Sequence, residues 1–306
     1  MPPESTPFCV VWIQGLTCNG NSHSFLNHPQ FAIVHEEMTL LYHPLFPSIC
    51  SFQEVLHRED VIDVLVIEGA LSHDTTVLSR QGLGMDAILK ALLPRTRFVV
   101  CAGSCASFGG VFKERDVRKI SGLVFRGEEK GGFFAEGFKT PWGHSPINLP
   151  GCPVHPAWIV DTLLLLKEKG KCALDAFLRP KEIYAYLVHH GCLRNEYFEW
   201  KVDCTQFGTK EGCLFYEQGC QGPMTHANCN KVLWNEVSSK TRVGSPCIGC
   251  TEPSFPKHTL YLTPKYMSLP AVPVGVPKRA YYALAGIAKG FRIDRLHVRL
   301  VDEEDE

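Results

Sequence analysis

A dense group of metal-binding side chains lies between residues 189 and 250. The sequence reads HHGC at 189–192, CLFYEQGC at 213–220, CNKVLWN from residue 229 and CIGC at 247–250. A C-x-x-C pair suits zinc or an iron-sulfur cluster, but a zinc site closes on four ligands, and six cysteines with one histidine do not divide into whole zinc sites. One site of four ligands and one of three would suit a 4Fe-4S cluster beside a 3Fe-4S cluster. Buried free thiols are the alternative interpretation.

Three further cysteines follow predicted strands in the first half of the chain. Cys18, Cys105 and Cys152 each come directly after a short apolar run. Loops at the carboxyl ends of parallel strands converge on one crevice, so these thiolates could bind one cluster although they are far apart in sequence. Nucleotide binding is the other interpretation of such a sheet, but the first turn lacks the G-x-G-x-x-G spacing.

The elements that must position these cysteines follow an alternating pattern. Short apolar runs rich in β-branched residues alternate with segments of helical period, which predicts a parallel, doubly wound α/β sheet. Ser22 or Ser24 is expected to cap a helix after the first strand, and Gly170 is placed to end a later helix. Strands are expected at 8–15, 38–44, 61–71, from 97 and before 150, and helices at 51–60, 85–93 and 157–170.

The periodicity changes after about residue 180. The remaining sequence is rich in Cys, Gly, Pro and aromatic residues, which predicts a smaller, irregular domain whose core is partly replaced by its clusters. We therefore expect two domains, at residues 1–180 and 181–306.

Composition excludes several classes of protein. The net charge of −1 leaves no broad basic field for nucleic acid, and the acidic run at 302–306 is typical of a solvated terminus. The chain has 14 cysteines, but its start has neither a basic region nor paired arginines ahead of an apolar core, so we expect reduced thiols and a cytoplasmic location. The apolar segment 157–166 contains Asp161 and is too short for a bilayer, so no transmembrane anchor is expected.

Several long motifs in this order closely resemble the small subunit of nickel-iron hydrogenases, specifically the signal-less cytoplasmic uptake branch that also contains hydrogen sensors. They are WIQGLTCNGNSHSFLN, GSCASFGG, INLPGCPVHPAWI, HHGC, GCLFYEQGCQGPMTHANCN and SPCIGCTEPSFP. The resemblance implies a flavodoxin-like first domain carrying a proximal cluster and a second domain carrying medial and distal clusters.

The resemblance also implies a ligand set for each cluster. Carried over by position, the proximal ligands are Cys18, Cys105 and Cys152; the medial 3Fe-4S ligands are Cys229, Cys247 and Cys250; and the distal 4Fe-4S ligands are His189, Cys192, Cys213 and Cys220. His189 has the H-x-x-C spacing and its neighbour His190 does not. The other cysteines, which match no ligand position and are expected to be free thiols, are Cys9, Cys50, Cys101, Cys172 and Cys204.

The sequence departs from the family pattern at the first loop. The common motif is C-x-x-C, but Asn21 stands where the fourth proximal ligand is usual. Since an amide oxygen is a weak neutral donor, the proximal cluster is either a 4Fe-4S cluster retained by Asn21 or water, or a 3Fe-4S cluster. The extra cysteines of some membrane-bound relatives would fall at Gly20 and Gly110, so any oxygen tolerance must have another origin.

By resemblance, this chain transfers electrons from a nickel-iron site on a separate large subunit to an acceptor protein or a quinone-linked carrier, and higher oligomers of the heterodimer are expected. It has no catalytic residue of its own. A hydrogen-sensing complex that signals to a kinase and a free-standing multi-cluster carrier are the alternatives. The stretch GGFFAEGF at 131–138 and Trp142 are expected to be apolar surface covered by the large subunit, with a local mini-core as the other interpretation.

Overall fold

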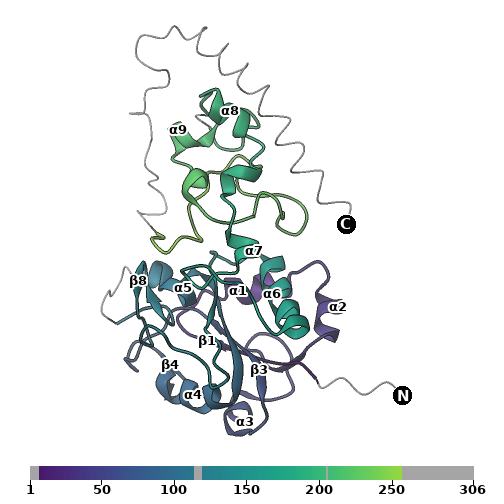
Figure 1. Cartoon of the computed structure of the whole chain (residues 1–306), viewed down its shortest axis with the longest axis vertical. Coiled ribbons are helices and arrows are strands. Elements are labelled where there is room, and N and C mark those ends of the chain that lie inside the picture. The colour runs from purple at the N-terminus through teal and green to yellow at the C-terminus, as the bar shows by residue number, and fades with distance from the viewer. Residues whose placement is uncertain (1–6, 114–118, 205, 257–306) are drawn as a thin grey trace.

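A parallel sheet forms the centre of the first domain, with strand order β2-β1-β3-β6-β9 (Figure 1). The computed structural model describes residues 7–113, 119–204 and 206–256, so the acidic run at 302–306 lies outside the described residues. The order of the strands is that of flavodoxin-like sheets, with the switch point between β1 and β3, and the predicted fold class is confirmed. The strands are β1 (Cys9–Gln14), β2 (Thr39–Tyr42), β3 (Ile62–Glu68), β6 (Thr96–Ala102) and β9 (Ile147–Leu149).

Helices connect the strands and cover the sheet. They are α1 (Gly20–Leu26), α2 (Phe31–Glu36), α3 (Phe52–His57), α4 (Met85–Leu92), α5 (Gly103–Phe108) and α6 (Pro156–Lys169). Two short antiparallel pairs lie outside the sheet, β4 (Ser79–Arg80) with β5 (Leu83–Gly84) and β7 (Phe125–Arg126) with β8 (Glu129–Lys130). Gly170 ends α6 in the left-handed conformation at φ 61°, as predicted.

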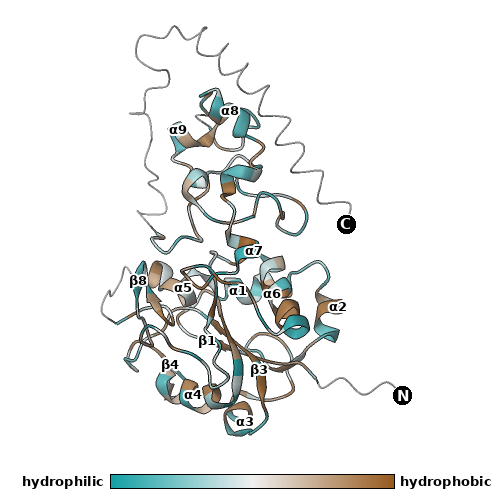
Figure 2. Cartoon of the chain, viewed as in Figure 1, coloured by the Kyte–Doolittle hydropathy of each residue, from teal (hydrophilic) through white to brown (hydrophobic). Residues whose placement is uncertain are grey.

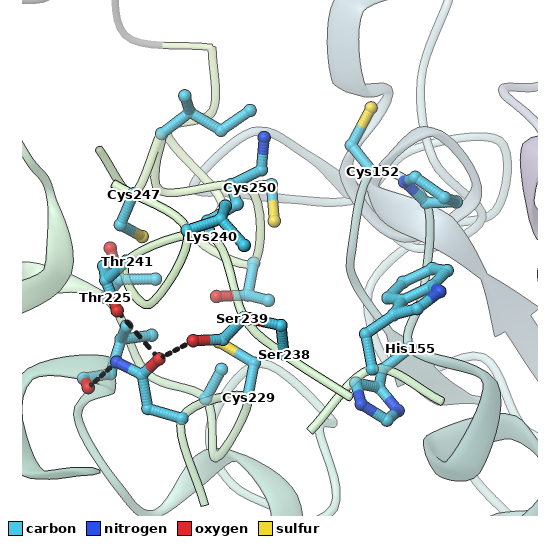
Figure 3. Close-up of a pocket in the computed structure, with 18 of the residues that line it drawn as sticks. Cys152, His155, Thr225, Cys229, Ser238, Ser239, Lys240, Thr241, Cys247 and Cys250 are labelled. Carbon is cyan, nitrogen blue, oxygen red and sulfur yellow. Dashed lines mark hydrogen bonds between the residues drawn. The ribbon is translucent and has the colours of Figure 1, made fainter. Parts of the chain in front are cut away.

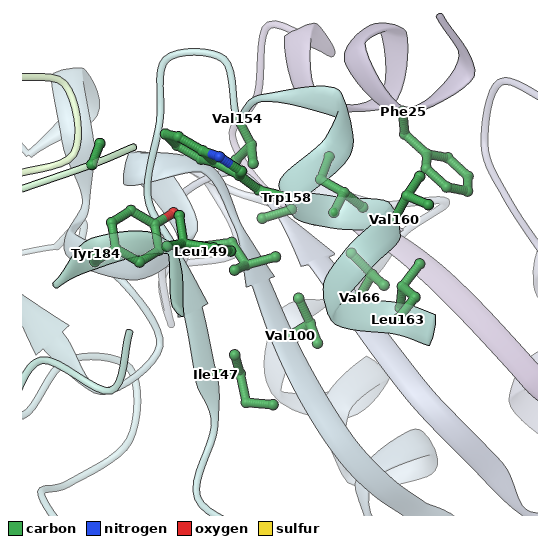
Figure 4. Packing of buried hydrophobic residues seen from close by; sticks show 14 of the residues in the cluster. Phe25, Val66, Val100, Ile147, Leu149, Val154, Trp158, Val160, Leu163 and Tyr184 are labelled. Atoms are coloured by element: carbon green, nitrogen blue, oxygen red, sulfur yellow. The ribbon is translucent and has the colours of Figure 1, made fainter. Parts of the chain in front are cut away.

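The sheet is apolar on both faces because helices cover both of them. Its strands are coloured mainly as hydrophobic in Figure 2. One core cluster includes Val66 and Val100 of the sheet together with Trp158 and Leu163 of α6 (Figure 4). Burial of this kind contributes about 25 cal/mol per Å² of apolar surface, so the sheet is a rigid base for the loops at its carboxyl edge.

The second domain contains little regular structure. Its helices, α7 (Lys181–Tyr184), α8 (Asn195–Glu199) and α9 (Leu214–Gln218), are short, and 3₁₀ turns span Val188–Gly191 and Gly222–Met224. Figure 1 shows this domain beyond the carboxyl edge of the sheet, with α7 at the junction. The described helices include none that is long and apolar enough to cross a membrane.

Two local predictions were wrong. Ser22 and Ser24 lie inside α1 and do not cap it: the Ser22 hydroxyl donates to Glu68, and the Ser24 hydroxyl donates to the Val154 carbonyl oxygen. In the Gly/Phe-rich stretch, Phe133 is buried in the core cluster on one face of the sheet, and Phe134 and Phe138 pack against that cluster. Trp142 is exposed, as expected.

Candidate metal centres

The proximal candidates meet at the carboxyl edge of the sheet. Cys18 is exposed on the loop after β1, Cys105 lies in the first turn of α5, and Cys152 lies on the loop after β9. Burial and the neighbouring Cys152 and Cys18 thiols raise the pKa of Cys105 to about 12. The Cys105 thiol is therefore protonated without metal, and iron must displace that proton when it binds.

Glu68 organises the loop that carries Cys18, and the sequence prediction missed it. This carboxylate ends β3 and is fully buried. It accepts hydrogen bonds from the backbone N–H groups of Asn21 and Ser22, at 3.0 and 3.2 Å, and from the Ser22 hydroxyl. The Trp12 indole and the Thr17 hydroxyl also donate to it. A single carboxylate thus fixes the strand, the loop and the start of α1.

The side-chain amide of Asn21 joins the three loops that follow β1, β6 and β9. Asn21 is buried, with 7% of its surface exposed. Its Oδ1 accepts from the Val154 N–H at 2.9 Å, and its Nδ2 donates to the Ala102 carbonyl oxygen at 3.2 Å. A Cβ on Gly103, whose φ is +94°, would lie 2.5 Å from Nδ2, so this close approach requires glycine. The amide oxygen already has a partner within the protein.

The medial candidates line a cavity of about 480 Å³ (Figure 3). Cys229, Cys247 and Cys250 lie on the second-domain side, and Cys152 lies across from them on the loop after β9. One proximal candidate, Cys152, therefore shares a cavity with the three medial candidates. Lys240 also lines it, and its positive charge opposes the effect of burial, which raises the pKa of both Cys152 and Cys250.

The four distal candidates line a second, small cavity. They are His189, Cys192, Cys213 and Cys220. Asn230 lines this cavity and the medial one, which makes the two sites neighbours. Its Nδ2 donates to the Val188 carbonyl oxygen at 2.7 Å, and its Oδ1 accepts from the hydroxyls of Ser239 and Thr241.

Of the two adjacent histidines, His189 is the one in the distal cavity. Burial lowers its pKa, and the neutral imidazole is the form that binds metal. The His190 ring instead accepts a hydrogen bond from the Leu187 N–H at 3.4 Å.

Arg194 is a second residue that sequence reasoning missed. It is buried in the distal cavity, two positions after Cys192. Its guanidinium donates to the carbonyl oxygens of Thr241 at 2.7 Å and Gly212 at 2.8 Å, and also to those of Thr209 and Glu211. Burial raises the pKa of Cys213 to about 12, and the charge of Arg194 acts in the opposite direction. Arg194 therefore holds the ligand loops and places a positive charge beside the site.

Backbone N–H groups point at several of the candidate thiols. The Phe215 N–H donates to the Cys213 Sγ at 3.4 Å, and the Cys247 N–H donates to the Cys220 Sγ at 3.2 Å. Hydrogen bonds to sulfur are one of the means by which proteins set the potential of iron-sulfur clusters. These donors suit bound thiolates.

The arrangement does not suit single metal ions. Within residues 7–113, 119–204 and 206–256, no group of three Cys, His, Asp or Glu side chains is placed to hold one ion. Ligands of an iron-sulfur cluster bind separate iron atoms and so lie further apart, and the thiolate-rich donor sets suit such clusters. The remaining thiols, Cys9, Cys50, Cys101, Cys172 and Cys204, are free, and Cys50, Cys101 and Cys204 are buried.

A flavodoxin-like sheet joined to a loop-rich, cysteine-dense domain defines a class of iron-sulfur electron-transfer protein. Comparison with family models agrees. Residues 184–262 match the model for the C-terminal region of the NiFe/NiFeSe hydrogenase small subunit. Residues 18–166 match the model "NADH ubiquinone oxidoreductase, 20 Kd subunit".

Known proteins are similar over most of the chain. The periplasmic NiFe hydrogenase small subunit of Solidesulfovibrio fructosivorans is 31% identical over 80% of this chain and 78% of that protein. The periplasmic NiFeSe hydrogenase small subunit of Desulfomicrobium baculatum is 29% identical over 81% of this chain and 84% of that protein. A chain in the structure of the actinobacterial-type NiFe-hydrogenase from Ralstonia eutropha aligns with a TM-score of 0.78 at 26% identity, covering 95% of this chain and 91% of that one.

The chain belongs to the family of nickel-iron hydrogenase small subunits. It is the electron-transfer subunit of an oxidoreductase whose catalytic site lies on the large subunit with which it pairs. Membership of this family supports a function in electron transfer over the two alternatives, a hydrogen-sensing complex and a free-standing carrier. Iron-sulfur clusters supply the one-electron chemistry when bound, and the candidate ligands described above are the side chains that would hold them.

Proposed function

We propose that this chain carries electrons in the direction of hydrogen oxidation, from the large subunit through proximal, medial and distal clusters to an outside acceptor. One observation carries this proposal: the candidate ligands form three sets in spatial succession, with Cys152 and Cys250 in one cavity and Asn230 between the second and third sets. The cytoplasmic uptake branch of the family is part of the proposal.

The proximal site is proposed to hold a cluster on the three thiolates of Cys18, Cys105 and Cys152. The Asn21 Oδ1 already accepts a hydrogen bond from the Val154 N–H. An amide oxygen is a weak neutral donor to iron, and this one would have to serve both partners. This favours the 3Fe-4S form of the proximal cluster over the 4Fe-4S form. The Asn21 side chain then serves to join the loops by hydrogen bonds.

The medial and distal sites are proposed to differ in the number of their ligands. Cys229, Cys247 and Cys250 line one cavity with Lys240, and the fourth thiol that lines it, Cys152, belongs to the proximal set. Three second-domain thiols in this cavity support a medial 3Fe-4S cluster. The distal set has three thiols and His189, which supports a 4Fe-4S cluster. A neutral histidine in place of a thiolate raises the potential of that cluster, as suits the last site before the acceptor.

The acceptor is proposed to dock beside the distal site. Leu193 follows Cys192 directly and is 67% exposed, and Val202, whose carbonyl oxygen accepts from the Cys213 N–H, is 40% exposed. Exposed apolar side chains at an electron exit suit an acceptor protein or a quinone-linked carrier. The cytoplasmic location, higher oligomers of the heterodimer, and the domain boundary at residue 180 stay predictions; the two relatives above are named periplasmic.

Hydrogen-dependent reduction of the purified heterodimer tests the proposed function. Under hydrogen, we expect the visible absorption of all three clusters to bleach, and to return when a quinone analogue or an acceptor protein is added. The same chain without its large subunit should not respond to hydrogen. Fast bleaching with no transfer to any acceptor, together with a co-purifying kinase, would instead support a sensor.

A further inference from the structure

Ser104 links the proximal site to the medial site through hydrogen bonds. It is 2% exposed and precedes Cys105 in the first turn of α5. Its N–H donates to the Gly151 carbonyl oxygen at 3.0 Å, and its Oγ accepts from the Gly151 N–H at 2.9 Å. The same hydroxyl donates to the carbonyl oxygen of Cys250. One side chain thus joins α5, the loop after β9 and the C-x-x-C loop of the second domain.

The residues that Ser104 connects are neighbours of candidate ligands on both sides. Ser104 is bonded to Cys105, and Gly151 is bonded to Cys152, both at the proximal site. Cys250 is at the medial site. Electronic coupling falls less steeply along covalent and hydrogen bonds than across an empty gap, so the path from Cys152 through Gly151 and the Ser104 hydroxyl to Cys250 is a short connected route between the sites.

The junction between the domains does not depend on this hydrogen bond alone. Arg179 Nη1 donates to the Thr251 carbonyl oxygen at 3.2 Å. Lys113 Nζ donates to the Pro253 carbonyl oxygen at 3.0 Å, and the Trp158 indole donates to Asn228 Oδ1 at 2.7 Å. Loss of the Ser104 hydroxyl should therefore leave the two domains docked.

We propose that Ser104 is a positioning residue for electron transfer, and that its hydroxyl couples the proximal site to the medial site. In this step one electron leaves the proximal site, which is oxidised, and enters the medial site, which is reduced; no bond forms or breaks and no proton moves. The proposal rests on the ligand sets of the proposed function. A second route exists, because the Cys152 N–H also faces the Cys250 thiol, so loss of the hydroxyl should slow this step without stopping it.

Three variants of the intact heterodimer test the proposal. Ser104→Ala removes the hydroxyl, and Ser104→Thr keeps one. Ser107→Ala is the matched control, since Ser107 lies on the same helix and its hydroxyl donates to the Cys101 carbonyl oxygen within the first domain, at 3.4 Å. Each variant is mixed with hydrogen and frozen at successive times, and electron paramagnetic resonance follows the proximal and medial signals separately.

In Ser104→Ala we expect proximal reduction at the wild-type rate, medial reduction slowed several-fold, and a weaker magnetic interaction between the two clusters. Ser104→Thr should restore the rate, and Ser107→Ala should match the wild type. A wild-type rate in Ser104→Ala with both spectra intact would overturn the proposal, and so would loss of the medial cluster, which would mean a structural role. Absence of separate proximal and medial signals in the wild type would instead contradict the proposed ligand sets.

Discussion

The proximal site and the two sites of the second domain are held by different means. The proximal loops leave the ends of parallel strands and are tied by the Glu68 carboxylate and the Asn21 amide. The medial and distal loops have only short helices nearby and are tied largely through backbone carbonyls, as in the contacts of Arg194 and Asn230. From this difference we expect the first site to be shaped by the protein before iron binds, and the other two to need their clusters to complete the fold.

Removing iron should produce the largest difference in folding between the two regions. In a domain that depends on metal, the free energy of metal binding is part of the free energy of folding. We therefore expect fast amide exchange throughout 186–256 in the iron-free chain, and continued protection in β1, β3 and β6. Hydrogen-exchange mass spectrometry of iron-loaded and iron-free heterodimer measures this. Equal protection of both regions without iron would show that the second domain folds by itself.

Glu68→Ala should disrupt the proximal site and leave the medial and distal sites intact. The substitution leaves buried donors such as the Asn21 N–H without a partner, and each such donor costs about 1–3 kcal/mol of stability. We therefore expect the free energy of unfolding to fall by about 3 kcal/mol or more, and the proximal cluster to be lost. Thermal unfolding and electron paramagnetic resonance of the heterodimer measure these effects. The exposed Glu59→Ala is the control. A full set of cluster signals in Glu68→Ala would mean that the loop is held by other contacts.

Arg194→Met should act on the distal site alone. The change removes a buried positive charge, and a cluster that loses such a charge is harder to reduce, so its midpoint potential should fall. Arg194→Lys keeps the charge but not the planar fork of donors, and should give a smaller fall. A redox titration of each cluster measures the shifts, with Arg126→Met, on the β7–β8 hairpin, as control. An unchanged distal potential in Arg194→Met would exclude the electrostatic role.

Gly110→Ala should have a smaller, local effect. Gly110 has φ +49°, and a Cβ there would lie 2.7 Å from the Cys105 Sγ. Gly137→Ala is a matched control, since Gly137 has φ +83° but no atom within 4 Å of a Cβ. Both variants carry backbone strain of about 1–2 kcal/mol, but only Gly110→Ala should alter the proximal spectrum. Identical spectra in the two variants would place Cys105 further from the cluster than we propose.

The sequence predicted the sheet well because its elements are periodic. Apolar runs such as that of β3 and the glycine after α6 have local causes that can be recognised along the chain. It also predicted which loops carry cysteines, since parallel strands bring their carboxyl ends together.

The contacts that shape the sites were not predicted, because they join residues far apart in sequence. The roles of Asn21 and Ser104 depend on partners more than 40 positions away, at Val154 and Gly151. Glu68 gave one recognisable signal, a carboxylate directly after the apolar run 64–67 of β3. The misplaced caps at Ser22 and Ser24 have the same origin. The Glu68 carboxylate accepts from the N–H groups of Asn21 and Ser22 at the start of α1, while the Ser22 hydroxyl donates to Glu68 and the Ser24 hydroxyl donates to the Val154 carbonyl oxygen.

Electron paramagnetic resonance of the oxidised heterodimer tests the central claim most directly, because a 3Fe-4S cluster in that state is paramagnetic and a 4Fe-4S cluster is not. If three thiolates hold the proximal cluster and Asn21 only joins the loops by hydrogen bonds, the spectrum contains two separate 3Fe signals, proximal and medial. Asn21→Cys should remove one of them and lower the proximal potential. A single 3Fe signal in the wild type, unchanged in Asn21→Cys, would contradict the account.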